Sequence, residues 1–194
     1  MSKVLIVAEH DGSKLNASTA KCVTCAKGIE GAEIAIAVLA ADGAKLAAEA
    51  AQIAGVTRVL RVDNAGNEHA LAATWAPQIA ELASGYSHVF GPSTTFGKDL
   101  MPRVAALLGA PQLSDIMAVE SATRFRRPVY AGNAILTVEV AADTQVVATV
   151  RVASYEAAAG GGSAPVESKS LSVELPGHTR FVSVSSAQTG RPDL

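Results

Sequence analysis

The feature of this sequence that most restricts its fold is a regular alternation of short apolar runs with longer segments of helical periodicity. The apolar runs, which predict strands, are Val4–Ala8, Ile34–Leu39, Val59–Val62 and His88–Gly91. The segments between and after them, which predict helices, are Asn16–Lys27, Ala44–Ala54, Glu68–Ala83 and Phe96–Leu108. Such spacing is typical of β-α-β units, and continuous apolar runs are typical of strands covered on both faces. The sequence therefore predicts an α/β fold with a doubly wound, mostly parallel sheet and helices on both faces.

The second half of the chain has a different pattern. After Pro111 the segments are short, rich in β-forming residues and joined by turns; they are Met117–Ser121, Arg124–Tyr130, Ile135–Val140 and Gln145–Val150. We expect these strands to add antiparallel partners to the sheet, with Asp143-Thr144 at the tip of a hairpin.

The segment Tyr155–Ser170 is small and polar. A glycine- and serine-rich stretch, Gly160–Ser163, lies at the centre of residues 156–170, and such a composition predicts a flexible loop. Leu171–Leu175 and Phe181–Val184 are candidate edge strands. We therefore expect one N-terminal α/β domain over residues 1–184 and a linker over residues 185–194.

Composition excludes several classes of function. A net charge of −2 and an aromatic content of 4% argue against nucleic-acid binding. No apolar run approaches the roughly 20 residues that span a bilayer. A strand that begins by Val4 leaves no room for a signal peptide, so we expect a cytoplasmic location, or a mitochondrial matrix location if a presequence has been removed.

Cys22 and Cys25 form a Cys-x-x-Cys motif, which can be a redox pair or half of a zinc site. A redox pair would stand at the start of a helix, whereas Asn16, Ser18 and Thr19 are the expected caps and place both thiols further inside. The sequence holds no second cysteine pair. We interpret the two cysteines as ordinary helix residues and predict no metal site.

The segment from Gly91 to Gly97 resembles a phosphate-binding loop, but it departs from one in two ways. Five residues separate the glycines where such a loop has four, and Asp99 stands where a hydroxyl would ligate magnesium. We interpret it as a strand-to-helix turn in which Ser93, Thr94 or Thr95 caps a helix that faces the sheet through Phe96, Leu100 and Val104. As a ligand pocket, the Ser93–Gly97 loop is supported by fold analogy alone.

Four arginines form the candidate partner interface. Arg124, Arg126 and Arg127 are the densest basic cluster and could meet acidic groups of a partner, or could be solvated on a strand and turn. Arg103 follows Pro102 inside a predicted helix, where proline removes one backbone bond. A helix kink at Pro102 could direct Arg103 at a partner. Alternatively, Arg103 could be buried and donate hydrogen bonds to carbonyl groups of the helix.

His88, Ser93 and Asp115 could be imagined as a hydrolytic triad, but the sequence has no Gly-x-Ser-x-Gly elbow. We expect His88 to open a strand and Asp115 to cap a turn. The sequence therefore predicts no catalytic residue.

Several ordered blocks of the sequence resemble the alpha subunit of electron-transfer flavoproteins. They are Val4–His10, Gly91–Ala105, Leu113–Ile116, Tyr130–Ala134 and Ala157–Ser163. Arg191–Leu194, at the end, resembles the hinge that precedes the family's FAD-binding domain.

The resemblance implies a scaffold and subunit-interface domain of a heterodimeric electron carrier, rather than an enzyme. The complete protein would accept electrons from flavin dehydrogenases, such as those of fatty-acid β-oxidation that act on acyl-CoA, and pass them to a downstream acceptor. FAD would be bound by a C-terminal domain absent from this chain, AMP by the beta subunit, and no cofactor by this chain alone.

The alternative is an adenine-nucleotide-binding module of the same fold that acts alone. It would use the first strand-to-helix turn and the Ser93–Gly97 loop. That first turn reads Glu9-His10-Asp11-Gly12-Ser13 instead of Gly-x-Gly-x-x-Gly. Two acidic residues there disfavour a pyrophosphate.

Overall fold

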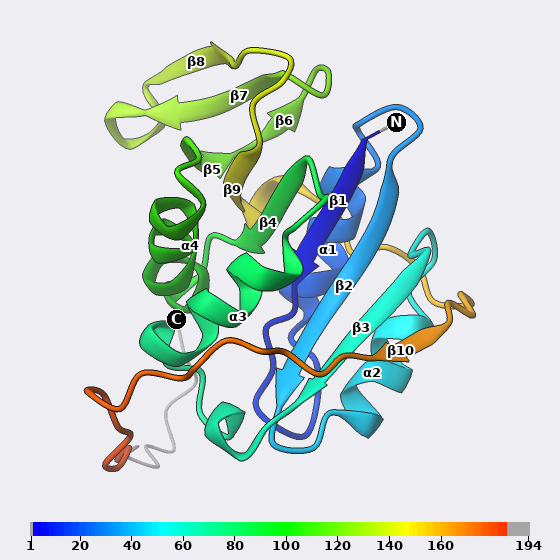
Figure 1. Ribbon diagram of the computed structural model, residues 1–194. Helices are drawn as coiled ribbons and strands as arrows, with labels where there is room; N and C mark the ends of the chain where they lie inside the picture. Colours follow the sequence, from blue (N-terminus) through cyan, green and yellow to red (C-terminus); the bar gives the residue numbers. More distant parts are fainter. Residues whose placement is uncertain (1, 186–194) are drawn as a thin grey trace.

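The computed structural model describes residues 2–185 and shows a central parallel sheet with helices on both faces (Figure 1). Within these residues, seven parallel strands lie in the order β10-β3-β2-β1-β4-β9-β5. Their bounds are β1 Lys3–Val7, β2 Glu33–Ala40, β3 Arg58–Asp63, β4 His88–Pro92, β5 Gln112–Ile116, β9 Val146–Val150 and β10 Val166–Ser168. The predicted doubly wound α/β fold is confirmed.

The alternation of side chains along each strand supplies two separate cores. Val4 and Ile6 of β1 face α1 (Ala17–Ala26) and α2 (Ala44–Ala51), while Leu5 and Val7 face α3 (Ala72–Leu82) and α4 (Thr95–Leu108). A strand must be apolar at every position to fill both cores, which is why β1 is a continuous apolar run.

Two helices are shorter than the sequence predicts. α2 ends at Ala51, and the carbonyl groups at its end accept hydrogen bonds from Gly162 and Ala164 rather than from a further helical turn. α3 begins at Ala72 instead of Glu68, and a single 3₁₀ turn stands at Ala65–Asn67 before it. The buried amides of Asn67 and Gln78 exchange two hydrogen bonds of 2.9 and 2.7 Å, which fix that turn against the helix.

The second half of the chain departs from prediction in strand order. β6 (Ala118–Val119), β7 (Arg124–Val129) and β8 (Ala134–Glu139) are antiparallel, as expected, but form a separate three-stranded sheet, here called the hairpin sheet. β9 lies between β4 and β5 and runs parallel to both. The predicted hairpin at Asp143-Thr144 is therefore wrong, because β8 and β9 belong to different sheets. β5 was not predicted, because Ser114 and Asp115 interrupt its apolar run.

The tail continues over the surface of the sheet and its helices. Residues 156–170, predicted to be flexible, lie against α1 and α2: Ala158 N–H donates to Ala20 and Gly162 N–H to Gln52. The end of this segment forms β10, which the sequence does not predict. Whether the loop moves stays a prediction.

The two predicted edge strands, Leu171–Leu175 and Phe181–Val184, are wrong. The Glu81 carboxylate accepts hydrogen bonds from the backbone N–H groups of Ser172 and Val173, which would otherwise pair in a sheet. The predicted linker, residues 185–194, lies outside the described residues except for Ser185.

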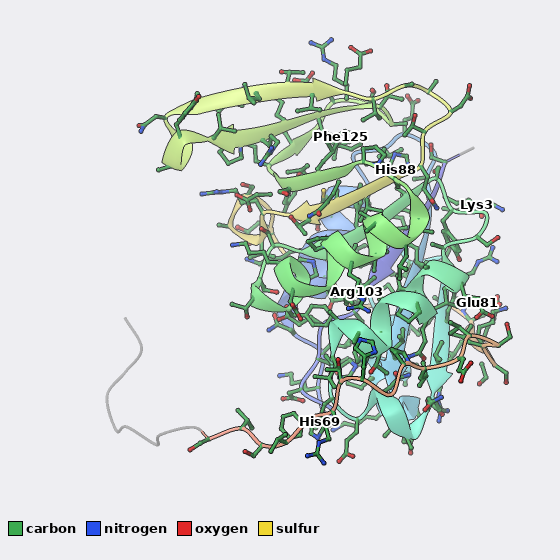
Figure 2. All side chains as sticks on the ribbon, turned by 60° about the vertical axis from the view of Figure 1, so that its left-hand side comes forward. Lys3, His69, Glu81, His88, Arg103 and Phe125 are labelled. Carbon is green, nitrogen blue, oxygen red and sulfur yellow. The ribbon has the colours of Figure 1, made fainter. Side chains whose placement is uncertain are left out.

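His88 joins the two sheets. It opens β4, as predicted, and only 3% of its surface is exposed. Its Nε2 lies 2.7 Å from the carbonyl oxygen of Ala122 and its Nδ1 lies 2.8 Å from the Ser87 hydroxyl. The carbonyl can only accept, so Nε2 carries the proton of a neutral imidazole. Figure 2 shows His88 below Phe125 of the hairpin sheet.

Burial lowers the pKa of His88 from its usual 6.5, so acid should destabilise the domain through this residue. The unfolded chain binds a proton near pH 6.5 while the folded chain resists it, so the His88 contribution is complete above that pH and is lost as pH falls through the folded pKa. Urea titrations at about pH 7 and about pH 5 should show a larger loss of unfolding free energy for the natural chain than for His88→Gln, whose amide can still donate to Ala122. Equal losses would contradict this role.

Candidate functional site

Ligands of doubly wound folds usually bind at the carboxyl edge of the sheet. Two of the hollows at this edge have volumes near 600 Å³. One follows β1, and here is called the first-turn pocket; its volume is about 600 Å³. The other lies between the hairpin sheet and the ends of β5 and β9, here called the hairpin cavity; its volume is about 610 Å³.

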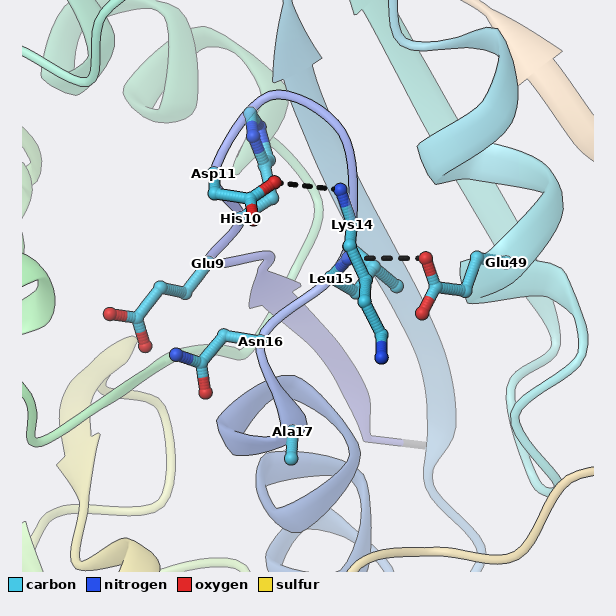
Figure 3. Close-up of a pocket in the computed structure, with 8 residues that line it drawn as sticks. All are labelled: Glu9, His10, Asp11, Lys14, Leu15, Asn16, Ala17 and Glu49. Carbon is cyan, nitrogen blue, oxygen red and sulfur yellow. Dashed lines mark hydrogen bonds between the residues drawn. The ribbon is translucent and has the colours of Figure 1, made fainter. Parts of the chain in front are cut away.

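The first-turn pocket is acidic, and its carboxylates hold its own backbone (Figure 3). Asp11 accepts hydrogen bonds from the N–H groups of Ser13 and Lys14, which with the Ser13 hydroxyl lower its pKa to about 2. Glu49 accepts a bond from the N–H of Leu15.

At the start of α1, side chains of the protein occupy the position where a pyrophosphate would bind. Asn16 is the N-cap and accepts a hydrogen bond from Ser18 N–H, while the Ser18 hydroxyl donates to Glu9 at 2.6 Å. Carboxylates repel an anion, so these residues do not fit the diphosphate of a dinucleotide.

The Ser93–Gly97 loop is a strand-to-helix turn, as interpreted from the sequence. Thr94 is the N-cap of α4 and accepts from Gly97 N–H, while Ser93 N–H donates to Val150. The N–H groups of Gly97 and Ser93 therefore already donate to acceptors within the protein. Leu100 and Val104 are buried against the sheet, and Phe96 packs on Trp75 at 5.7 Å between ring centres.

The hairpin cavity brings together three basic side chains and one acidic side chain from different parts of the chain. Its lining comprises Lys98, Asp115, Arg127, Pro128, Val129, Tyr130, Ala131, Gly132 and Arg151. Lys98 comes from α4, Asp115 from β5, Arg127 from β7, and Arg151 follows β9. Three cations thus share the cavity with one carboxylate.

Two of these cations, Arg127 and Arg151, form hydrogen bonds with consecutive residues of β5. Arg127 Nε donates to the Ser114 carbonyl oxygen at 2.8 Å, and Arg151 Nη1 lies 2.7 Å from Asp115 Oδ2. The buried Thr149 hydroxyl oxygen accepts from the Asp115 N–H at 2.8 Å. Asp115, expected to cap a turn, instead orients Arg151 from within a strand.

Backbone strain gathers at the same cavity. In residues 2–185, the non-glycine residues with positive φ are Asp115 at 59°, Tyr130 at 51° and Ala131 at 54°, and all three line it. Such conformations cost free energy and cluster at functional sites.

The four arginines of the candidate interface are not brought together. Arg124 and Arg126 lie on the outer face of the hairpin sheet, where Glu120 is 2.8 and 3.9 Å from their Nε atoms. Arg127 lies on the opposite face with Phe125. Arg103 is exposed on α4, which contradicts the reading of a buried arginine (Figure 2).

His88, Ser93 and Asp115 do not form a triad. His88 begins β4 and Ser93 follows its end, so the two stand at opposite ends of the strand. Both ring nitrogens of His88 are engaged elsewhere, and Asp115 pairs with Arg151.

Comparison with known proteins decides the family. The model of the electron transfer flavoprotein domain matches residues 4–174. The chain belongs to this family.

The most similar relatives include alpha subunits of electron transfer flavoproteins from bacteria and a mitochondrion. That of Pseudomonas aeruginosa is 45% identical over 98% of this chain and 61% of its own length. That of Paracoccus denitrificans is 41% identical over 98% of this chain and 61% of its own length. The mitochondrial subunit of Dictyostelium discoideum is 41% identical over 86% of this chain and 49% of its own length. The chain thus spans about 60% or less of these relatives.

Three sequence blocks that carry the electron-transfer flavoprotein resemblance meet at the hairpin cavity. Gly91–Ala105 supplies Lys98, Leu113–Ile116 supplies Asp115, and Tyr130–Ala134 supplies the hairpin tip. These blocks lie far apart in the chain, so their convergence makes the cavity the strongest candidate site of the domain.

Sequence reasoning missed Lys98, Asp115 and Arg151 as members of one site. Arg151 had a usable signal: it is the first polar residue after the apolar run Val146–Val150. If that run is assigned as a parallel strand, Arg151 falls at the carboxyl edge, beside the other ligand-binding positions.

Cys22 and Cys25 lie inside α1, are free and are buried. Desolvation raises the pKa of Cys22 well above its usual value and that of Cys25 to about 12. Among residues 2–185, no cluster of three or more histidine, cysteine or acidic side chains could hold a metal ion. In the same part of the chain, no helix is long and apolar enough to cross a membrane.

Both thiols should therefore resist modification in the folded chain, because the thiolate is the reactive species. Reaction with Ellman's reagent at about pH 8 should be at least about 100-fold slower in buffer than in unfolding urea. Rapid reaction of either thiol in the folded state would contradict its burial.

Proposed function

We propose that this chain is the scaffold and subunit-interface domain of a heterodimeric electron-transfer flavoprotein, and that its hairpin sheet contacts the beta subunit. The observation that carries the proposal is the unpartnered surface of that sheet. Tyr130 is 82% exposed, and Ile135 and Leu136 are each 46% exposed. Ile135 and Leu136 are consecutive in β8 and point to opposite faces, so both faces of the sheet expose an apolar side chain near arginines, and arginine is enriched at protein interfaces. The alpha-subunit names of the relatives support the same role.

In this proposal the complete protein accepts electrons from flavin dehydrogenases, for example acyl-CoA dehydrogenases, and delivers them to a downstream acceptor. FAD supplies the redox chemistry and is bound by a C-terminal domain outside this chain, and AMP is bound by the beta subunit. The acidic first-turn pocket supports this division, since it does not fit the diphosphate of FAD. The chain itself orients the other domains and carries no electrons.

The same proposal places the protein in the bacterial cytoplasm, or in the mitochondrial matrix after removal of a presequence. Its relatives are named both from bacteria and from mitochondria. It includes no nucleic-acid partner and no membrane insertion. The Arg103, Arg124, Arg126 and Arg127 side chains are proposed to contribute to partner contacts from their separate positions.

A pair of matched variants tests the interface. Leu136 and Val166 are 46% and 44% exposed, on the hairpin sheet and on the distant edge strand β10 (Figure 1). Leu136→Ser should raise the Kd for the beta subunit about 10-fold, because truncating an interface anchor costs more than about 1 kcal/mol. Val166→Ser should leave the Kd unchanged. Weakening by Val166→Ser alone would place the interface elsewhere, and absence of binding by the natural chain would refute the proposal.

A further inference from the structure

We propose that the hairpin cavity receives an acidic side chain of the partner subunit, an Asp or Glu carboxylate flanked by apolar residues. This inference rests on the proposed function and names the chemistry by which the partner is recognised. The cavity is lined by Lys98, Arg127 and Arg151, and Asp115 supplies one carboxylate.

The charges in the cavity are unbalanced. Asp115 neutralises Arg151 through one oxygen, whereas Arg127 donates only to a neutral carbonyl group. Among the described residues, Lys98 has no acidic partner within ion-pair distance. The cavity therefore holds a net charge of about +2, and a carboxylate entering it lowers the mutual repulsion of the cations.

The donors are positioned before any partner arrives. Arg127 uses its Nε and Arg151 uses one terminal nitrogen to contact adjacent residues of β5, so terminal N–H groups of both guanidinium groups remain for a ligand. Guanidinium groups fixed in this way suit a planar carboxylate, because less side-chain entropy is lost on binding. Asp115, whose φ is 59°, contacts Arg151 from this strained position.

The rim favours a polypeptide over a small ion. Tyr130 lines the cavity and is 82% exposed, and Leu136 stands opposite Arg127 on the neighbouring strand. A free phosphate would contact the cations but leave these apolar groups in water. A carboxylate on a protein segment with apolar neighbours covers both parts of the surface.

The test uses two lysines with the same charge change. Lys98 lies in the cavity, and Lys45 is exposed on α2, on the other side of the sheet. Affinity for the beta subunit should be measured at about 50 mM and about 500 mM salt. Lys98→Gln should weaken binding about 5-fold or more at low salt and reduce the salt dependence, because screening acts on the contact it removes. Lys45→Gln should change the Kd less than about 2-fold.

The possible failures can be told apart. If the natural chain binds no beta subunit, the proposed function and this inference both fail. If binding occurs but Lys98→Gln behaves like Lys45→Gln, the inference alone is overturned. It is also overturned if inorganic phosphate, titrated at constant ionic strength, saturates the cavity in a Lys98-dependent manner without competing with the beta subunit.

Discussion

Replacing Gly97 with alanine is expected to destabilise the domain by about 3 kcal/mol or more. A Cβ atom at Gly97 would overlap the carbonyl oxygen of Pro92 and lie 3.0 Å from its carbonyl carbon. Both groups are backbone, at the point where α4 packs on the end of β4, so no flexible side chain can move aside. Either the N-terminal turn of α4 or the strand end must shift, and Leu100 and Val104 shift with it.

Gly177→Ala is the matched control, because a Cβ there has no heavy atom within 4 Å. Its unfolding free energy should stay within about 0.5 kcal/mol of the natural chain. Urea denaturation followed by circular dichroism measures both variants. A Gly97→Ala domain as stable as the Gly177→Ala domain would mean that α4 does not pack as closely on β4 as described.

Phe125→Ala should cost about 3–5 kcal/mol and also weaken partner binding. Phe125 is fully buried and extends from the hairpin sheet into the main core, against which Val119 and Val138 of the same sheet also pack. Its ring centre lies 6.4 Å from that of Phe90 and 6.1 Å from that of His88. Without it, the hairpin sheet keeps its own ladder but loses its fully buried anchor in the main core, which loosens its position beside the cavity.

Phe125→Leu separates the two effects, because it retains most of the apolar volume. We expect it to cost about 1 kcal/mol and to leave the affinity for the beta subunit nearly unchanged. Affinity should be measured at a temperature at which both variants remain folded. If a folded Phe125→Ala domain bound the beta subunit as tightly as the natural chain does, partner binding would not depend on the position of the hairpin sheet.

The elements predicted correctly from the sequence are those whose apolar runs and capping residues lie within or next to the element. β1 to β4 each place apolar side chains on both faces of the sheet, and α4 follows a threonine cap and ends at Leu108, before Gly109, whose φ is 61°. These signals lie within a few residues of the element that they specify.

Two features that were not predicted, the parallel position of β9 in the main sheet and the existence of β5, depend on pairing between residues far apart in the sequence. β9 is apolar enough to be recognised as a strand, but its neighbours, beginning at His88 and Gln112, lie far away in the sequence. β5 reads as a turn because Asp115 is polar, and its conformation is stabilised by Thr149 from β9. The hairpin cavity forms only when this strand order brings Lys98, Arg127 and Arg151 together. Local pattern identified Arg127 within a basic cluster but not the other two cations.

Size-exclusion chromatography with an absorbance spectrum, for the chain alone and mixed with the beta subunit, tests whether this chain is a flavin-free interface domain. We expect a colourless chain that elutes as a heterodimer after mixing. A yellow chain that retains flavin by itself, or an elution volume that the beta subunit leaves unchanged, would contradict this expectation.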